Sequence, residues 1–109
     1  METVKFSYNW NNKLNNKCFT TFRIWNPRKY TKDSLIVVEL WEKKIITMKY
    51  EARIIESLPC KLNVLPVFLT YLDSGYGVEE FIKLVRTIYK NTKLDLDNTT
   101  FCFYLLKKV

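Results

Sequence analysis

The spacing of apolar residues changes from an alternating to a helical period after Pro59, and this change restricts the possible folds more than any other feature. Ahead of Pro59, apolar and polar residues alternate, which is the pattern of half-buried strands. The alternation predicts strands over residues 4–10, 18–25, 35–41 and 45–55. The polar, asparagine-rich residues 11–17 are expected to form a simple connection between the first two strands.

Beyond Pro59 the apolar residues recur at helical spacing. Residues 65–72 are spaced as a short helix, with Asn63 as its N-cap, and residues 78–89 carry one continuous apolar stripe. A last apolar run, Phe101–Leu106, predicts a closing strand. Because short loops join neighbouring strands, we expect antiparallel pairing and an α+β domain with a curved or closed sheet.

The length of the chain, 109 residues, fits one domain over residues 1–109. Its 7 Phe, 7 Tyr and 3 Trp provide too much apolar surface for a disordered chain. The apolar run Phe101–Leu106 is far shorter than the ~20 residues of a membrane-spanning helix. The first residues also lack the apolar segment of a secretion signal, so we expect a cytoplasmic protein without a membrane partner.

Several common chemistries require residues that this chain lacks. It has no histidine, which excludes every mechanism that uses an imidazole base. The cysteines Cys18, Cys60 and Cys102 are too far apart in sequence for a zinc motif, so no metal site is expected. Only Gly75 and Gly77 are present, too few for a phosphate-binding glycine loop, and we expect no cofactor.

The positive charge is concentrated near the N-terminus. The net charge is +7, yet residues 3–32 hold seven lysines and arginines and no acidic residue. Such a one-signed segment attracts polyanions, although it could also be a solvated basic face that keeps the protein soluble. Aromatic residues lie among these cations, as in proteins that stack unpaired bases beside phosphate contacts. The predicted nucleic-acid-binding residues are Lys13, Lys17, Arg23, Trp25, Arg28, Lys29, Tyr30 and Lys32.

Short motifs along most of the chain resemble the ASCH domain family. They are Thr20-Thr21-Phe22-Arg23, then Tyr30-Thr31-Lys32-Asp33 before a hairpin, then Leu72-Asp73-Ser74-Gly75-Tyr76 leading into Val78-Glu79-Glu80-Phe81. ASCH domains belong to the PUA-like superfamily. The resemblance implies a curved antiparallel β-barrel with two short helices between the fourth and last strands. It also implies RNA or a modified nucleoside as the partner.

The same resemblance implies a second function. Some small ASCH proteins are amidohydrolases that remove the acyl group from N4-acetylcytidine with a lysine, a threonine and an acidic residue. Aligned on Arg23, the threonine position falls on Thr21, and Lys17 and Asp73 lie one residue from the other two positions. A desolvated lysine can activate a threonine or a water without histidine. The alternative assignment is therefore a small amidohydrolase with Lys17, Thr21 and Asp73 as catalytic residues.

Alternatives remain at this point for individual residues and for the function. Arg23 could bind a phosphate or a base edge, or could pair with Asp73 or Glu80 and hold the sheet to a helix. Trp25 and Tyr30 could stack bases, or could cover one end of the barrel. The sequence does not decide between a binding module and an enzyme, and a partner-binding protein of viral or phage origin is a third alternative.

Overall fold

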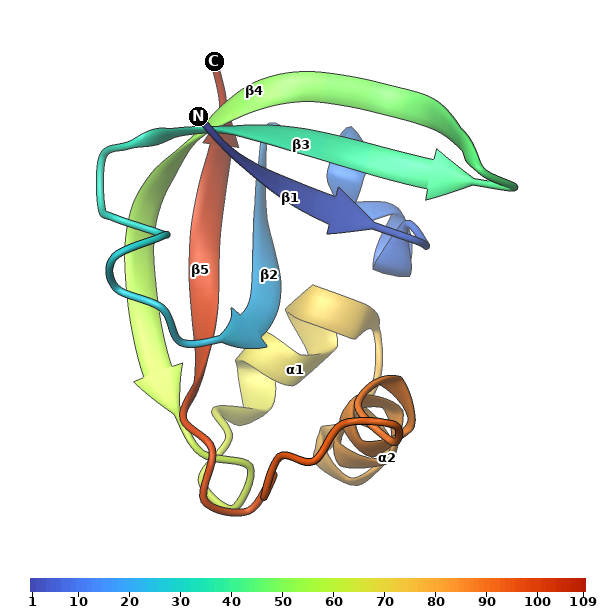
Figure 1. Ribbon diagram of the computed structural model, residues 1–109, viewed down its shortest axis with the longest axis vertical. Helices are drawn as coiled ribbons and strands as arrows, with labels where there is room; N and C mark the ends of the chain where they lie inside the picture. The colour runs from blue at the N-terminus through green and yellow to red at the C-terminus, as the bar shows by residue number, and fades with distance from the viewer.

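The computed structural model describes residues 1–109 and contains five strands, two α-helices and one 3-10 helix (Figure 1). In chain order these are β1 (Glu2–Phe6), the 3-10 helix η1 (Trp10–Asn15), β2 (Cys18–Ile24), β3 (Leu35–Glu42), β4 (Ile45–Cys60), α1 (Val67–Ser74), α2 (Val78–Ile88) and β5 (Phe101–Lys108). The α+β class is therefore as expected, with both α-helices between the fourth and fifth strands.

The strands form one mixed sheet with the order β1-β3-β4-β5-β2. Three of the four pairings are antiparallel, but β1 runs parallel to β3, so the prediction of a wholly antiparallel sheet is wrong. The reason is that β1 and β2 occupy opposite edges of the sheet although they are neighbours in sequence. A parallel pair needs a long crossover connection, and residues 7–34, which include η1 and β2, provide it.

The long strand β4 gives the sheet its curvature. Its first half pairs with β3 and its second half with β5, and the register shifts between Ile54 and Glu56. An irregularity of this kind bends a strand, so β4 continues from the upper part of the sheet into its side wall (Figure 1). The edge strands β1 and β2 form no ladder with each other, and the sheet is curled but not closed into a barrel. The unpaired gap between β1 and β2 is called the open seam below.

Strand β5 lies between β4 and β2 and is buried on both faces, which explains its unbroken apolar sequence. Cys102, Tyr104 and Leu106 belong to the core inside the curled sheet. Phe101 and Phe103 belong to a second core between the outside of the sheet and the helices. The apolar stripe of α2 enters this second core as expected, and the ring of Phe81 lies 5.0 Å from that of Phe22 on β2.

The helix α1 differs from its prediction in both position and orientation. It begins after Pro66 rather than at Asn63 and ends at Gly75, which has a left-handed backbone (φ 84°). Its buried residues are the polar Thr70, Asp73 and Ser74. Of the predicted apolar stripe, Phe68 and Leu72 face solvent, whereas Leu65 and Leu69 pack against the second core. The apolar spacing therefore predicted the helix correctly, but only half of the predicted stripe is packed against the core.

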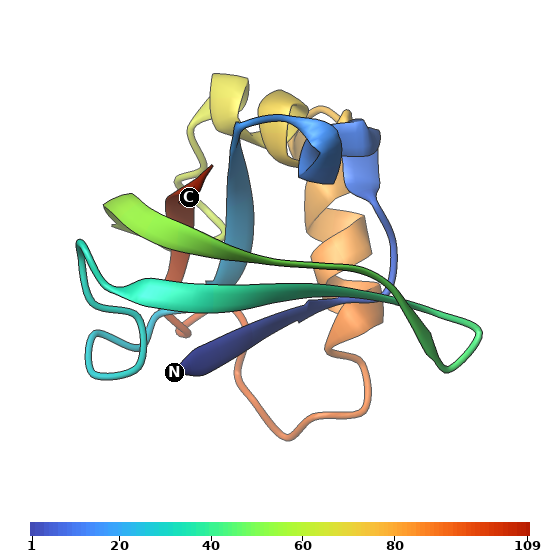
Figure 2. The same cartoon turned by 90° about the horizontal axis from the view of Figure 1, so that it is seen from above.

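The segment between β1 and β2 is the other main correction. β1 ends at Phe6 instead of Trp10, and the expected plain connection contains η1. Asn11 and Asn12 have positive φ angles (56° and 52°), which asparagine tolerates better than most residues. The resulting tight turns bring η1 against α1 and β2, as Figure 2 shows from above.

Candidate functional site

A cavity of about 210 Å³ lies at the open seam. The end of β1 and strand β2 form its sides, and η1, α1 and α2 complete its walls. Its polar lining consists of Lys5, Ser7, Lys13, Thr21, Arg23, Asp73 and Ser74. The residues of this cavity, called the seam cavity below, come from five different elements or their ends, which explains why no single sequence motif describes it.

A buried ion pair forms one wall of the seam cavity. Lys13 Nζ on η1 lies 2.9 Å from Asp73 Oδ1 on α1, and the two side chains are only 4% and 8% exposed. The hydroxyl of Thr20 donates a second hydrogen bond, 2.8 Å long, to the same carboxylate oxygen. Burial lowers the pKa of Lys13, and the charge of Asp73 opposes that shift. This cluster joins η1, β2 and α1 beneath the cavity.

The structure places Lys13, and not Lys17, beside Asp73. Lys17 is exposed just before β2, and its backbone carbonyl accepts a hydrogen bond from the backbone of Lys108. The predicted catalytic group of Lys17, Thr21 and Asp73 therefore does not assemble in the predicted form. Lys13 lies beside Asp73 because the turns at the start of η1 direct its side chain inward, a conformation that no periodic pattern reveals.

Arg23 is the most informative residue of the seam cavity. Its Nε donates to Thr21 Oγ1 (3.0 Å) and its Nη2 donates to the backbone carbonyl of Lys5 (2.7 Å), so this side chain spans the open seam from β2 to β1. None of the ion pairs in the structure includes Arg23, and the suggested pairing with Asp73 or Glu80 does not form. Burial lowers the pKa of Arg23, and the phenols of Tyr30 and Tyr89 and the charge of the nearby Asp73 oppose the shift. Arg23 is thus a partly buried cation whose hydrogen bonds all go to neutral oxygen atoms, and its guanidinium lies 4.9 Å from the centre of the Phe6 ring.

Thr21 has little freedom in the seam cavity. Its side chain is 2% exposed and its oxygen accepts the hydrogen bond from Arg23 Nε. That bond fixes the hydroxyl and the guanidinium in a defined relative position on the same face of β2. No lysine or carboxylate forms a hydrogen bond with the Thr21 hydroxyl.

Aromatic side chains that the sequence analysis did not select also line the seam cavity. Trp10 and Tyr89 are partly exposed there, on η1 and just after α2. Trp10 is supported by Tyr8, with ring centroids 4.6 Å apart, and Tyr89 by Phe101 at 5.7 Å. Trp10 was assigned to a strand and Tyr89 to the buried stripe of a helix, so neither position suggested a ligand contact.

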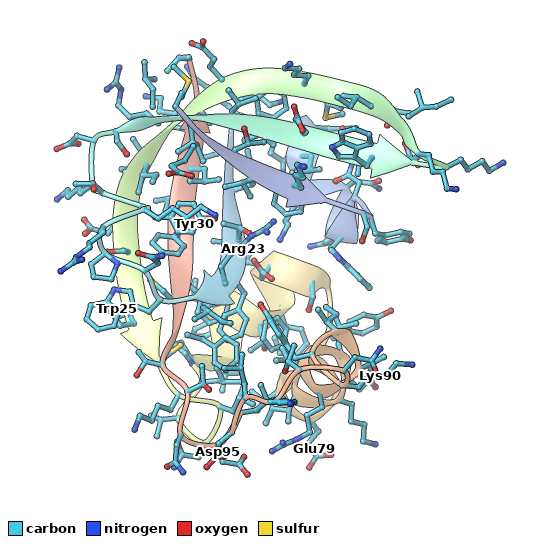
Figure 3. The ribbon with its side chains drawn as sticks, viewed as in Figure 1. Arg23, Trp25, Tyr30, Glu79, Lys90 and Asp95 are labelled. Atoms are coloured by element: carbon cyan, nitrogen blue, oxygen red, sulfur yellow. The ribbon has the colours of Figure 1, made fainter.

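The other predicted nucleic-acid-binding residues lie outside the seam cavity. They are Trp25, Arg28, Lys29, Tyr30 and Lys32, which follow β2 into the loop before β3. Figure 3 shows Trp25 at the margin of the molecule, away from Arg23. Lys29 and Lys32 lie 3.9 Å and 3.5 Å from the carboxylates of Glu2 and Glu56. Tyr30 packs against the inner core and its ring lies 5.1 Å from that of Tyr104.

No group of three or more histidine, cysteine or acidic side chains is arranged to hold a metal ion. None of the helices combines the length and apolar character needed to cross a bilayer. Comparisons with protein-family models, with curated proteins and with solved structures found no match to this chain. The ASCH resemblance therefore stays a prediction, and the function has to be argued from the seam cavity itself.

Proposed function

We propose that this protein binds single-stranded RNA or a modified nucleoside, with one nucleotide unit occupying the seam cavity. The observation that supports this most strongly is Arg23, a partly buried cation without a carboxylate partner. Buried charges in proteins are normally paired, because desolvation of an unpaired charge is costly. An anionic or strongly hydrogen-bonding ligand would supply the missing partner.

The chemistry of Arg23 suits a phosphate or the edge of a base. A guanidinium has five N–H donors in a planar fork, and the bonds to Thr21 and Lys5 use two of them. The fork can bind a phosphate or two acceptors of a base at once. The seam cavity, at about 210 Å³, is smaller than the ~300–1,000 Å³ of common ligand pockets, so it suits one planar group.

Two further features favour a nucleotide over a simple anion. Trp10 and Tyr89 provide aromatic surface beside the cations, and stacking of a base on such rings contributes about 1–3 kcal/mol. Lys17 and Arg28 are exposed and form no ion pair, so they are free to contact the phosphates of neighbouring nucleotides. A ligand longer than one nucleotide would then lie across the N-terminal part of the surface.

The salt dependence of binding tests this proposal. If about four cations contact phosphates of a single strand, the logarithm of the affinity should fall with the logarithm of the salt concentration with a slope of about −3. Fluorescence anisotropy with a short labelled RNA would measure this slope, and a duplex of the same sequence serves as the control. Binding without salt dependence, or equal affinity for the duplex, would contradict the proposal.

A second candidate function is hydrolysis of an acylated nucleoside such as N4-acetylcytidine. One observation favours it: the seam cavity contains a lysine of lowered pKa, a threonine and a carboxylate, namely Lys13, Thr21 and Asp73. In this assignment the lysine differs from the predicted Lys17. Thr21 Oγ1 would attack the acyl carbon and pass its proton, by way of Lys13, to N4 of the cytidine as the bond between the acyl carbon and N4 breaks. Water would then hydrolyse the acyl-threonine, release acetate and restore the hydroxyl, and Arg23 would stabilise the negative charge that develops on the acyl oxygen.

Incubation with N4-acetylcytidine separates the two functions. The hydrolase assignment predicts release of acetate, and a loss of about a hundredfold or more in rate for Thr21→Ala. The exposed Thr47 provides a matched control, because Thr47→Ala should leave the rate unchanged. Binding of the nucleoside without any turnover, or turnover unaffected by Thr21→Ala, would eliminate this assignment and leave the binding function alone.

A further inference from the structure

A second hollow, called the hairpin hollow below, lies between the start of η1 and the β3–β4 hairpin. It has a volume of about 340 Å³, and the hairpin that forms one side of it extends past the end of β1 (Figures 1 and 2). Tyr8 and Asn12 line it on one side, and Leu40, Glu42, Thr47 and Met48 line it on the hairpin. None of these residues lines the seam cavity, so the hairpin hollow is a separate site.

A pair of aromatic rings connects the hairpin hollow with the seam cavity. Trp10 lines the seam cavity and Tyr8 lines the hairpin hollow, and the centroids of their rings are 4.6 Å apart. Tyr8 is 58% exposed in spite of this contact. Each ring therefore offers a surface to a different hollow, and exposed aromatic rings are the surfaces on which unpaired bases stack. A strand that passes over the pair places one base in each hollow.

The polar groups of the hairpin hollow suit the edge of a base. The side-chain amide of Asn12 forms no hydrogen bond within the chain, whereas the amides of its neighbours Asn9 and Asn11 do. The carboxylate of Glu42 accepts a hydrogen bond of 2.6 Å from Thr47 at Oε1, and this leaves Oε2 free. An amide that can donate and accept thus lies in the same hollow as a free carboxylate oxygen.

The charge of the hairpin hollow excludes a phosphate and favours a base. No lysine or arginine lines it, and its one charged side chain is the carboxylate of Glu42. A carboxylate repels a phosphate but accepts hydrogen bonds from an amino group such as N4 of cytosine. Leu40 and Met48 add apolar surface for the flat face of a base. The phosphate that joins two nucleotides fits better in the seam cavity, beside Lys5 and Arg23.

We propose that the protein binds two successive nucleotides of a single strand, with one base in the seam cavity and the other in the hairpin hollow. This inference rests on the proposed function and specifies the length of the ligand and the kind of its second base. Tyr8 and Trp10 lie between the two bases. The second base carries an exocyclic amine, which donates to Glu42, while the amide of Asn12 donates to a ring nitrogen or oxygen of the base. Uracil lacks this amine and presents an oxygen atom in its place.

A free nucleoside occupies the seam cavity alone. Hydrolysis of N4-acetylcytidine therefore does not involve the hairpin hollow. Thr47, which lines only the hairpin hollow, remains a valid control for that reaction.

Isothermal titration calorimetry with mononucleotides and dinucleotides tests the second site. The wild-type affinity for the dinucleotide pCpC should exceed that for cytidine monophosphate by about fivefold to a hundredfold, the contribution of one stacked base. Tyr8→Ala should remove most of this gain and change the affinity for the mononucleotide by less than about threefold. Tyr71→Ala is the matched control, because Tyr71 is 52% exposed on α1 and lines neither hollow. This variant should keep the whole gain.

The choice of base is tested with pUpU and uridine monophosphate. In the wild type the gain from mononucleotide to dinucleotide should be smaller for uridine than for cytidine by about threefold or more. Glu42→Gln should reduce this difference, because an amide can also donate to an oxygen of uracil. The comparison of gains cancels the general effect of removing a negative charge. Glu51→Gln removes the same charge from an exposed residue of β4 and should preserve the difference.

The possible failures separate this inference from the proposed function. Equal affinity for pCpC and cytidine monophosphate would overturn the second site and leave the proposed function standing. The same holds if Tyr71→Ala loses as much of the gain as Tyr8→Ala, or if the wild type gains equally with cytidine and uridine. If neither nucleotides nor a longer single-stranded RNA bind, both proposals are wrong. Circular dichroism shows whether each variant is folded.

Discussion

Replacing Lys13 with methionine is expected to lower the free energy of unfolding by about 3–5 kcal/mol. The substitution leaves Asp73 as a buried carboxylate with only the Thr20 hydroxyl as a partner. Breaking a buried pair by removing one charge is far more costly than removing both. Because the free energy of unfolding of a small protein is about 5–15 kcal/mol in total, a large share of the stability depends on this one side chain. Urea denaturation followed by circular dichroism measures the change.

Two further variants show whether the cause is the unpaired charge. Lys13→Met combined with Asp73→Asn should recover at least half of the lost stability, because the neutral amide still accepts the hydrogen bond from Thr20. Lys17→Met removes an exposed lysine and should change the stability by less than about 0.5 kcal/mol. A Lys13→Met variant as stable as Lys17→Met would show that the buried pair does not hold η1 to α1.

The period of the apolar residues predicted most of the elements. The predicted strands at 18–25 and 35–41 and the helix at 78–89 lie within about two residues of β2, β3 and α2. Each of these elements buries one face along its length, so its apolar residues recur at a regular spacing that can be recognised in the sequence. In β2, for example, Phe22 and Ile24 face the helices while Phe19 packs in the inner core, as alternation along a strand requires.

The sheet topology and the seam cavity could not be obtained in the same way. The parallel pairing of β1 with β3 depends on where the chain returns after β2, which the spacing of apolar residues does not specify. Similarly, Lys13 and Trp10 line the cavity because the chain turns sharply at the two residues of η1 with positive φ angles. This turn involves only a few residues, so it leaves no periodic pattern in the sequence. In α1 the helical spacing was clear, but the polar side is buried because Asp73 pairs with Lys13.

Arg23→Met is expected to separate binding from stability. The variant removes the only cation of the seam cavity that spans from β2 to β1. The affinity for single-stranded RNA should therefore fall by about tenfold to a hundredfold, which corresponds to the free energy that hydrogen bonds to a charged group contribute. The free energy of unfolding should change by less than about 1 kcal/mol. The lost bonds to Thr21 and Lys5 are offset because an unpaired cation no longer has to be desolvated.

The controls for this variant distinguish a specific contact from the loss of one positive charge. Arg53→Met removes the same charge from the outer face of β4, where Arg53 is exposed, and should weaken binding by no more than about threefold. Arg23→Lys keeps the charge but loses the planar fork, so its affinity should lie between those of Arg23→Met and the wild type.

A titration of short single-stranded RNA into the wild-type, Arg23→Met and Arg53→Met proteins tests most directly whether the seam cavity binds a nucleotide. We predict that Arg23→Met alone loses most of its affinity while all three proteins unfold at similar urea concentrations. If Arg23→Met binds RNA as tightly as the wild type, or if Arg53→Met loses as much affinity, the cavity at the open seam is not the binding site.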